Sequence, residues 1–324
     1  MVWMQLVATR LTQAVAMALV LATLCFGFVQ ALPGDLATRI AAARVGEARL
    51  TPEIATRIRA QAGLDQPVLV QYGGWLADLA RGELGRSLVT GEPVVAEFRY
   101  HAGHTLVLGL LGWALSYLIA LPIGLWAGLR PGGWVDRISD AAAVLLASLP
   151  PFLTGIALIS LFALTLTWLP PAGFGTWAHR VLPALTLALG LAAFAVPVIR
   201  TAVVEVRGAF YLTYAQIKGL GETAAFRHHG LRNAAIPIVT YAALQMTFVI
   251  DGFVVIETLF NHPGLGAWLV KALLARDVPV ILAASLAIGF LFSLVSLITD
   301  ALCLALDPRA RAASVRLGRG WSAR

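Results

Sequence analysis

Long apolar runs dominate this 324-residue sequence and constrain its fold more than any other feature. A helix needs about 20 mainly apolar residues to cross the hydrocarbon core of a bilayer. Six runs of about this length or longer are separated by charged residues or by proline and glycine: residues 11–32, 105–129, 138–169, 181–199, 236–256 and 280–306. Because lipid offers no hydrogen-bond partners to a backbone, each run must be helical. The sequence therefore predicts an all-α membrane protein with about six transmembrane helices.

Composition supports membrane insertion and excludes a soluble domain. Hydrophobic residues make up 59% of the chain and charged residues only 13%, whereas soluble domains are about one-quarter charged. The net charge is +7, but the basic residues flank apolar runs, which indicates contact with lipid headgroups and not with nucleic acid. Cys25 and Cys303 both lie inside apolar runs, so neither a disulfide framework nor a metal site is indicated.

The distribution of basic residues predicts the orientation of the chain. With the N-terminus on the cytoplasmic side, the short outer loops hold only Arg180, Lys271 and Arg276, and the other short loops and the C-terminal tail are rich in arginine. The positive-inside rule then places both termini in the cytoplasm. The first apolar run could also be a signal peptide, but it is long for one, which favours a retained helix.

Residues 33–104 differ from the rest of the chain because they hold eight arginines and eight acidic residues. Leu69, Tyr72, Leu76 and Leu79 recur there at helical spacing. We therefore expect four regions: an N-terminal transmembrane helix (1–32), a helical insert outside the membrane (33–104), a five-helix core (105–306) containing a polar loop (207–235), and a basic cytoplasmic tail (307–324).

The polar loop is the strongest candidate for an interaction site. Its first half places Tyr211, Tyr214, Ile217 and Lys218 at helical spacing, with little bulk at Ala215 and Gly219. A short helix with a small-residue face could enter a cleft of another protein. The second half, residues 226–237, is basic before the next apolar run begins.

The motifs of several enzyme classes are missing. No GxxxxGK[ST] loop is present, so nucleotide, if it drives this protein, must be bound by another chain. His101 and His104 approach metal-ligand spacing without a third ligand nearby. No GxSxG motif appears either. We expect no catalytic residues, no metal and no directly bound cofactor.

Acidic residues inside apolar runs are candidates for a solute path, because a charge at bilayer depth is costly. Asp251 lies deep in the fifth run, and either lining a path or bonding to a neighbouring helix would explain it. Glu257 could also line a path, although pairing at the interface is favoured for it and for Asp300. A proton-coupled carrier using Asp251 and Glu257 is the alternative class, but the inverted repeats typical of such carriers are not seen.

Several phrases along the chain together resemble a known family. They are Pro33-Gly34-Asp35, LDQPVLVQY (64–72), GRSLVTGEPV (85–94), KGL (218–220), RNAAIPIVT (232–240), VIETLFNHPGLG (255–266) and Leu306-Asp307-Pro308-Arg309. In this order they resemble the inner-membrane permease subunits of binding-protein-dependent ABC importers, in the dipeptide, oligopeptide and nickel group.

The resemblance implies a type I permease of the bacterial inner membrane that forms half of a path for peptides or similar solutes. A homologous second permease, two cytoplasmic ATPase subunits that use ATP, and a periplasmic binding protein would be its partners. The resemblance leaves nickel chelates and glutathione open as solutes. Residues 33–104 and 261–277 would then meet the binding protein.

In such importers the polar loop resembles a coupling helix that docks on the ATPase. Thr213, Tyr214 and Ala215 stand where the general pattern has Glu-Ala-Ala, and Arg232 replaces a proline. The residues that the resemblance assigns to coupling are Tyr211, Thr213, Tyr214, Ala215, Lys218, Gly219, Leu220, Leu231 and Arg232. Asp251 departs from the family pattern, in which a small or apolar residue is expected.

Overall fold

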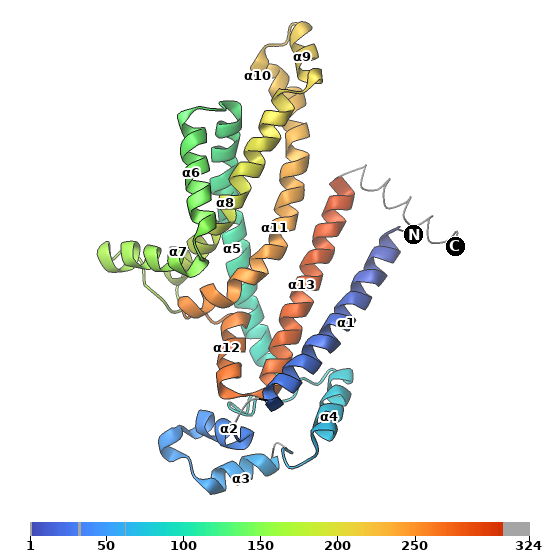
Figure 1. The fold of residues 1–324 in the computed structure, drawn as a ribbon, viewed down its shortest axis with the longest axis vertical. Helices are drawn as coiled ribbons and strands as arrows, with labels where there is room; N and C mark the ends of the chain where they lie inside the picture. The colour runs from blue at the N-terminus through green and yellow to red at the C-terminus, as the bar shows by residue number, and fades with distance from the viewer. Residues whose placement is uncertain (1, 32–33, 62, 307–324) are drawn as a thin grey trace. The chain divides into compact units, whose positions relative to one another are not determined.

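The structure is a computed structural model that describes residues 2–31, 34–61 and 63–306 (Figure 1). Over that part of the chain it is helical and contains no β-strand, which confirms the predicted all-α class. The helices are α1 (Val2–Ala31), α2 (Leu36–Val45), α3 (Pro52–Gln61), α4 (Val68–Ala80), α5 (Val94–Leu129), α6 (Trp134–Ser148), α7 (Pro151–Leu158), α8 (Ala178–Arg207), α9 (Phe210–Ile217), α10 (Glu222–Ala225), α11 (Leu231–Leu259), α12 (Leu265–Ala275) and α13 (Val278–Leu306). The predicted tail 307–324, with the Asp307-Pro308-Arg309 phrase, and Leu32 and Pro33 lie outside the described residues.

Length and composition mark candidate membrane spans. Four stretches qualify as single helices: Ala8–Phe28, Val94–Leu129, Ala178–Arg207 and Val278–Cys303. Two bent pairs also qualify when each is counted as one span: Trp134–Ser148 with Pro151–Thr165, and Glu222–Val249 with Gly252–Leu259. Four to six spans agree with the six predicted from the sequence.

The apolar run 138–169 is not one straight helix, as its length had suggested. The chain turns by 109° between α6 and the helical segment that begins at Pro151. Leu149 and Pro150 both adopt extended backbone angles there, with ψ of 131° and 141°. A proline clashes with a helical conformation of the residue before it. The pair Pro150-Pro151 therefore ends α6, and Pro151 begins the next helix at a position where proline is tolerated.

Two compact units divide the chain. The bundle unit consists of Val107–Asn261 together with short pieces near both ends of the chain. The insert unit consists of Arg10–Leu106 and His262–Ser293. Each unit has hydrophobic clusters of its own and is described separately below.

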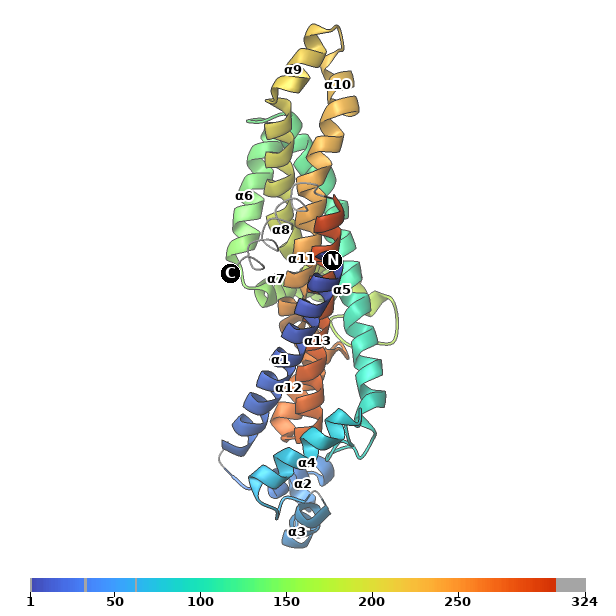
Figure 2. The same ribbon diagram turned by 90° about the vertical axis from the view of Figure 1, so that its right-hand side faces the viewer.

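Helices α8 and α11 run side by side through the bundle unit (Figures 1 and 2). Glycines allow α5 to approach α8 closely: a Cβ at Gly124 would lie 2.7 Å from the Ile199 side chain, and one at Gly128 would lie 2.6 Å from that of Val203. Close helix approach through small residues is typical of membrane proteins. The indole of Trp113 in α5 also donates to the Ala242 carbonyl of α11 at 3.0 Å.

In the insert unit, helices α2 and α3 pack through buried Ile40, Ala41 and Ile58. Asp35 caps the start of α2 by accepting hydrogen bonds from the backbone N–H of Thr38 (2.9 Å) and from its hydroxyl (2.5 Å). Side-chain capping of this kind satisfies backbone donors that a helix leaves open. The Pro33-Gly34-Asp35 phrase thus contains the start signal of α2.

A buried carboxylate holds two distant segments of the insert unit together. Asp277, which follows α12, is buried and accepts hydrogen bonds from the Ser87 hydroxyl (2.5 Å) and from the backbone N–H groups of Leu88 (3.0 Å) and Val89 (3.3 Å). Ser87 precedes Asp277 by 190 residues. We call this arrangement the Asp277 latch. It fixes the GRSLVTGEPV loop to the loop between α12 and α13.

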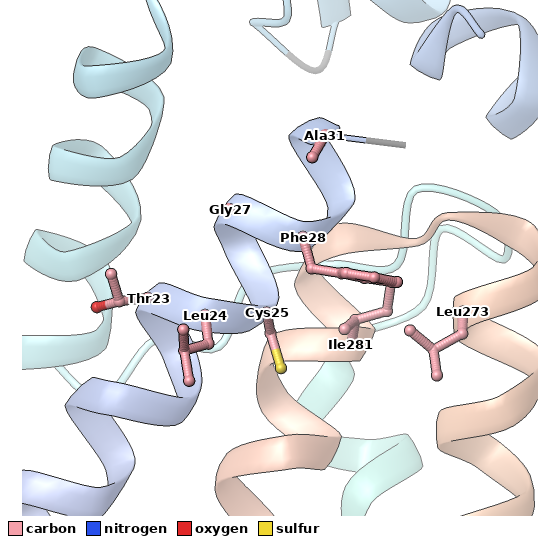
Figure 3. Close-up of a pocket in the computed structure, with 8 residues that line it drawn as sticks. All are labelled: Thr23, Leu24, Cys25, Gly27, Phe28, Ala31, Leu273 and Ile281. Atoms are coloured by element: carbon pink, nitrogen blue, oxygen red, sulfur yellow. The ribbon is translucent and has the colours of Figure 1, made fainter. Parts of the chain in front are cut away.

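An apolar cavity of about 570 Å³ also lies in the insert unit, between α1, α12 and α13. Figure 3 shows Phe28 extending from α1 toward Ile281 of α13, with Leu273 of α12 beside them. Cys25 is within hydrogen-bond distance of the Ser285 hydroxyl (3.3 Å). With a lining this apolar, the cavity has little to offer a polar solute.

Candidate functional site

The short helix expected in the polar loop is present as α9, at one end of the α8 and α11 pair (Figures 1 and 2). Of the residues assigned to coupling, Tyr211, Thr213, Tyr214 and Ala215 belong to α9. Lys218, Gly219 and Leu220 follow it directly, and Leu231 and Arg232 begin α11. The structure therefore brings all nine residues into one helical hairpin.

The KGL sequence forms the C-terminal cap of α9. The Gly219 N–H donates to the Gln216 carbonyl (2.9 Å), and the Leu220 N–H donates back to the Ala215 carbonyl (3.2 Å). This pair of bonds is the Schellman arrangement, in which the residue after the cap adopts a left-handed conformation that favours glycine. Gly219 has a φ of +94°. Gly219 thus sets the direction in which the chain leaves α9.

One side of α9 packs inward. Leu212 and Ala215 are buried with Ala225, and the partly buried Leu220 and Phe226 complete the cluster. The small residue Ala215 therefore packs within the bundle unit. This finding differs from the expectation that the small residues of α9 would form its outward face.

The outward face of α9 is bulky and apolar. Phe210 is 79% exposed and Ile217 is 75% exposed, with Tyr211 and Tyr214 also exposed between them. These four residues recur along one side of the helix and are called the α9 face below. The Lys218 ammonium lies 4.6 Å from the centroid of the Tyr214 ring, a cation–π arrangement. Sequence reasoning missed Phe210, although its spacing of four from Tyr214 was a usable signal.

The α9 hairpin is tied to the rest of the bundle unit by Arg207, the last residue of α8. Its guanidinium donates to the Leu129 carbonyl at the end of α5 and pairs with Glu222 at the start of α10. Three helix ends therefore meet at one side chain.

Basic side chains surround the second half of the hairpin. Arg227, His228, His229 and Arg232 are all exposed. Gly230 is buried behind them, and a Cβ there would lie 2.6 Å from the Phe226 ring. The glycine thus allows the start of α11 to lie against Phe226. Leu231 is exposed and adds an apolar residue beside this basic surface.

The two candidate path residues lie in α11. Glu257 is fully buried inside the bundle unit. The side chain of Asp251 lies outside the described part of the chain. A path-lining role for either residue stays a prediction.

A cavity of about 480 Å³ is enclosed by the last residues of α6, the start of α7, and facing turns of α8 and α11. Most of its lining is apolar, and it includes Gly190 and Phe194 of α8 and Tyr241 and Gln245 of α11. Helices α8 and α11 both include stretches that qualify as candidate membrane spans. The cavity is the best candidate within the bundle unit for a surface that solute could touch.

Comparison with known proteins supports an assignment for the whole chain. Residues 120–312 match the family model described as the binding-protein-dependent transport system inner membrane component, and residues 3–96 match the model of its N-terminal region. The chain belongs to this family. It is therefore an inner-membrane permease of an ABC importer, as the sequence resemblance implied. Permeases of this family work with a solute-binding protein and with ATPase subunits.

Individual relatives extend over nearly the full length of this permease. It is 36% identical over 305 residues to the glutathione transport system permease protein GsiC of Escherichia coli (strain K12), which covers 94% of this chain and 98% of the relative. It is 37% identical over 302 residues to the protein of the same name from Pectobacterium atrosepticum, covering 93% and 97%. The family is one of transport permeases, which fits the missing enzyme motifs.

Proposed function

We propose that this permease forms one half of a transmembrane path for peptide-like solutes, glutathione among them, with a homologous second permease as the other half. A periplasmic binding protein delivers the solute, and two cytoplasmic ATPase subunits drive the cycle. The names of relatives that match almost the entire chain support this solute class. Both termini then lie in the cytoplasm.

The α9 face is the observation that carries the coupling part of the proposal. An exposed stripe of three aromatic side chains and an isoleucine is costly in water and is typical of a surface that another protein covers. Aromatic side chains are also enriched at the centres of protein interfaces. The ATPase groove covers the α9 face, and the basic residues beside it meet the rim of that groove.

The mechanism follows from how α9 is held. ATP-driven closure of the two ATPases shifts the docked helix as a rigid body, because its inner side is packed against Ala225 and Phe226. Arg207 passes the shift to the ends of α5 and α8. The long helices α8 and α11 carry it into the membrane, where opening alternates between the two sides.

The insert unit supplies the contact with the binding protein in this proposal. The Asp277 latch holds the GRSLVTGEPV loop against the loop after α12, so both segments present one fixed surface. A fixed surface loses little conformational entropy when it binds a partner.

The test is purification of the tagged permease from membranes in mild detergent, with identification of the proteins that accompany it and an ATPase assay. We expect a second permease and ATPase subunits with the wild-type chain, and loss of the ATPase with Ile217→Glu or Phe210→Glu. Leu69→Glu is the matched control, because Leu69 is 83% exposed on α4 of the insert unit. Retention of the ATPase by both α9 variants would contradict docking at the α9 face.

A further inference from the structure

One polar side chain of the bundle unit is placed at a cost that packing does not explain. Gln245 is 1% exposed and lines the 480 Å³ cavity. Its Nε2 donates to the Leu191 carbonyl of α8 at 2.6 Å, but its Oε1 is buried and has no hydrogen-bond partner among the described residues. A buried acceptor without a donor is unfavourable, most of all at membrane depth. Leucine or methionine would suit these apolar surroundings better.

Several other buried polar side chains of this unit have hydrogen-bond partners. Ser116, Thr186 and Thr299 each donate their hydroxyl to a backbone carbonyl at 2.7 to 2.8 Å. Tyr117 also has an unpartnered buried hydroxyl within the described chain, but it does not line the cavity. Gln245 thus has an unpaired acceptor and also lines the cavity.

A glycine of α8 leaves free space beside the cavity wall. Gly190 of α8 lines it, and a Cβ added at Gly190 would meet no atom within 4 Å. A glycine in the middle of a helix disfavours the helix relative to alanine. At Gly190 no close packing accounts for it, unlike at Gly124 and Gly128. The cavity lining thus includes a glycine of α8 with free space beside it and a glutamine of α11 with an unpaired, covered acceptor.

The chemistry of the lining indicates the kind of group that fits. No charged side chain lines the cavity among the described residues, and its remaining polar groups are hydroxyls such as those of Thr154 and Tyr241. An unpaired carbonyl acceptor fits a hydrogen-bond donor of the solute, such as the N–H of an amide. The volume of the cavity, about 480 Å³, lies within the range of small-molecule sites, about 300–1,000 Å³.

We propose that this cavity is a solute-contact site of the translocation path, in which Gln245 Oε1 accepts a hydrogen bond from an amide N–H of the passing solute. The inference rests on the proposed function and assigns the residue that recognises the peptide bond. In the conformation described here the acceptor is covered. A relative shift of α8 and α11, as alternating access requires, uncovers it.

The test uses the complete transporter, with its partner permease, ATPases and binding protein, in proteoliposomes. The probes are reduced glutathione, trialanine and the depsipeptide analogue of trialanine in which an ester oxygen replaces one amide N–H. We measure the ratio of trialanine uptake to analogue uptake at saturating binding protein. Because the binding protein is the same throughout, a change in this ratio between permease variants comes from the permease.

We expect Gln245→Leu to lower that ratio about 3- to 10-fold, the effect of one lost hydrogen bond. Gly190→Leu fills the cavity and lowers the maximal uptake of every probe. The matched controls, Ser116→Ala and Gly103→Leu, leave uptake unchanged, because neither residue lines the cavity and Gly103 has open space around its Cα.

Three results would overturn the inference. An unchanged uptake ratio in Gln245→Leu would show that Gln245 makes no hydrogen bond to the solute. An equal loss of uptake for trialanine and its analogue, together with a lower melting temperature, would show that Gln245 has only a structural role. If a wild-type complex assembles and hydrolyses ATP but takes up none of the probes, then peptide-like compounds are not its solutes. Only that last result also contradicts the proposed function.

Discussion

Asp136 of α6 and Arg200 of α8 form a two-point ion pair inside the bundle unit. Arg200 Nη2 donates to Oδ2 of Asp136 at 2.9 Å, and Nε donates to the other carboxylate oxygen. The same carboxylate accepts the N–H of Gly132 at 2.7 Å, in the turn between α5 and α6. One buried carboxylate thus joins α8 to the turn between α5 and α6.

Replacing Asp136 by asparagine should destabilise the bundle unit. The change leaves the Arg200 guanidinium without its anionic partner, and breaking a buried ion pair from one side is strongly unfavourable. Because Arg200 is partly exposed, we expect a loss of about 2 kcal/mol and a melting temperature lower by several degrees. Thermal unfolding of the purified complex measures it. The melting temperature of Arg200→Lys should lie between those of the wild type and Asp136→Asn, since lysine keeps the charge but cannot donate two parallel hydrogen bonds as a planar guanidinium does. A melting temperature equal to wild type in Asp136→Asn would contradict this account.

Gly219 should be sensitive to a single added methyl group, and Gly221 should not. Gly219 has a φ of +94°, which L-residues with a side chain rarely adopt, whereas Gly221 has a φ of −62°. Neither glycine has an atom within 4 Å of the added Cβ, so only backbone strain separates the two variants. We expect Gly219→Ala to cost about 1 kcal/mol and to weaken retention of the ATPase in the pull-down. Equal behaviour of Gly219→Ala and Gly221→Ala would show that the cap of α9 does not govern docking.

Asp277→Asn should loosen the GRSLVTGEPV loop. An asparagine keeps one acceptor but turns an N–H₂ group toward the donors that the carboxylate now receives from Ser87, Leu88 and Val89. Hydrogen exchange of residues 87–92 should speed up at least tenfold, and capture of the binding protein should weaken. Asp78→Asn is the control, because Asp78 makes an exposed ion pair with Arg81. Unchanged exchange in Asp277→Asn would mean that the latch does not hold the loop.

The stability of the first turn of α2 should decrease at acid pH. Hydrogen bonding from the Thr38 hydroxyl, opposed in part by burial, keeps the pKa of Asp35 below its ordinary value of 3.8, and the backbone N–H of Thr38 and Arg59 lower it further. A lowered folded-state pKa contributes stability that is fully present above 3.8 and is lost as the pH falls through the lowered value. Exchange protection at the start of α2 should therefore hold at pH 5 and decline below about pH 4. Asp35→Asn should remove that decline, and a pH dependence that survives the substitution would assign it to another group.

Much of the fold followed from short-range rules. Apolar length fixed the number of spans, and Tyr211, Tyr214 and Ile217 predicted α9 from their spacing alone. The length of the run 138–169 predicts one span, and its prolines at 150 and 151 predict an interruption; the size of the turn, 109°, came only from the structure. Sequence spacing also could not show which side of α9 faces inward, and it placed Ala215 on the wrong side.

By itself the sequence determined the membrane class, most of the long helices and the family, because bilayer thickness and helical periodicity act over a few residues. The tertiary structure alone decided that Phe210 faces outward, that Asp277 meets Ser87 across 190 residues, and that Gln245 has an open acceptor at a cavity wall. These relationships depend on which faces of distant helices meet. No local pattern specifies that, since each side chain finds its partners only when the whole unit has packed.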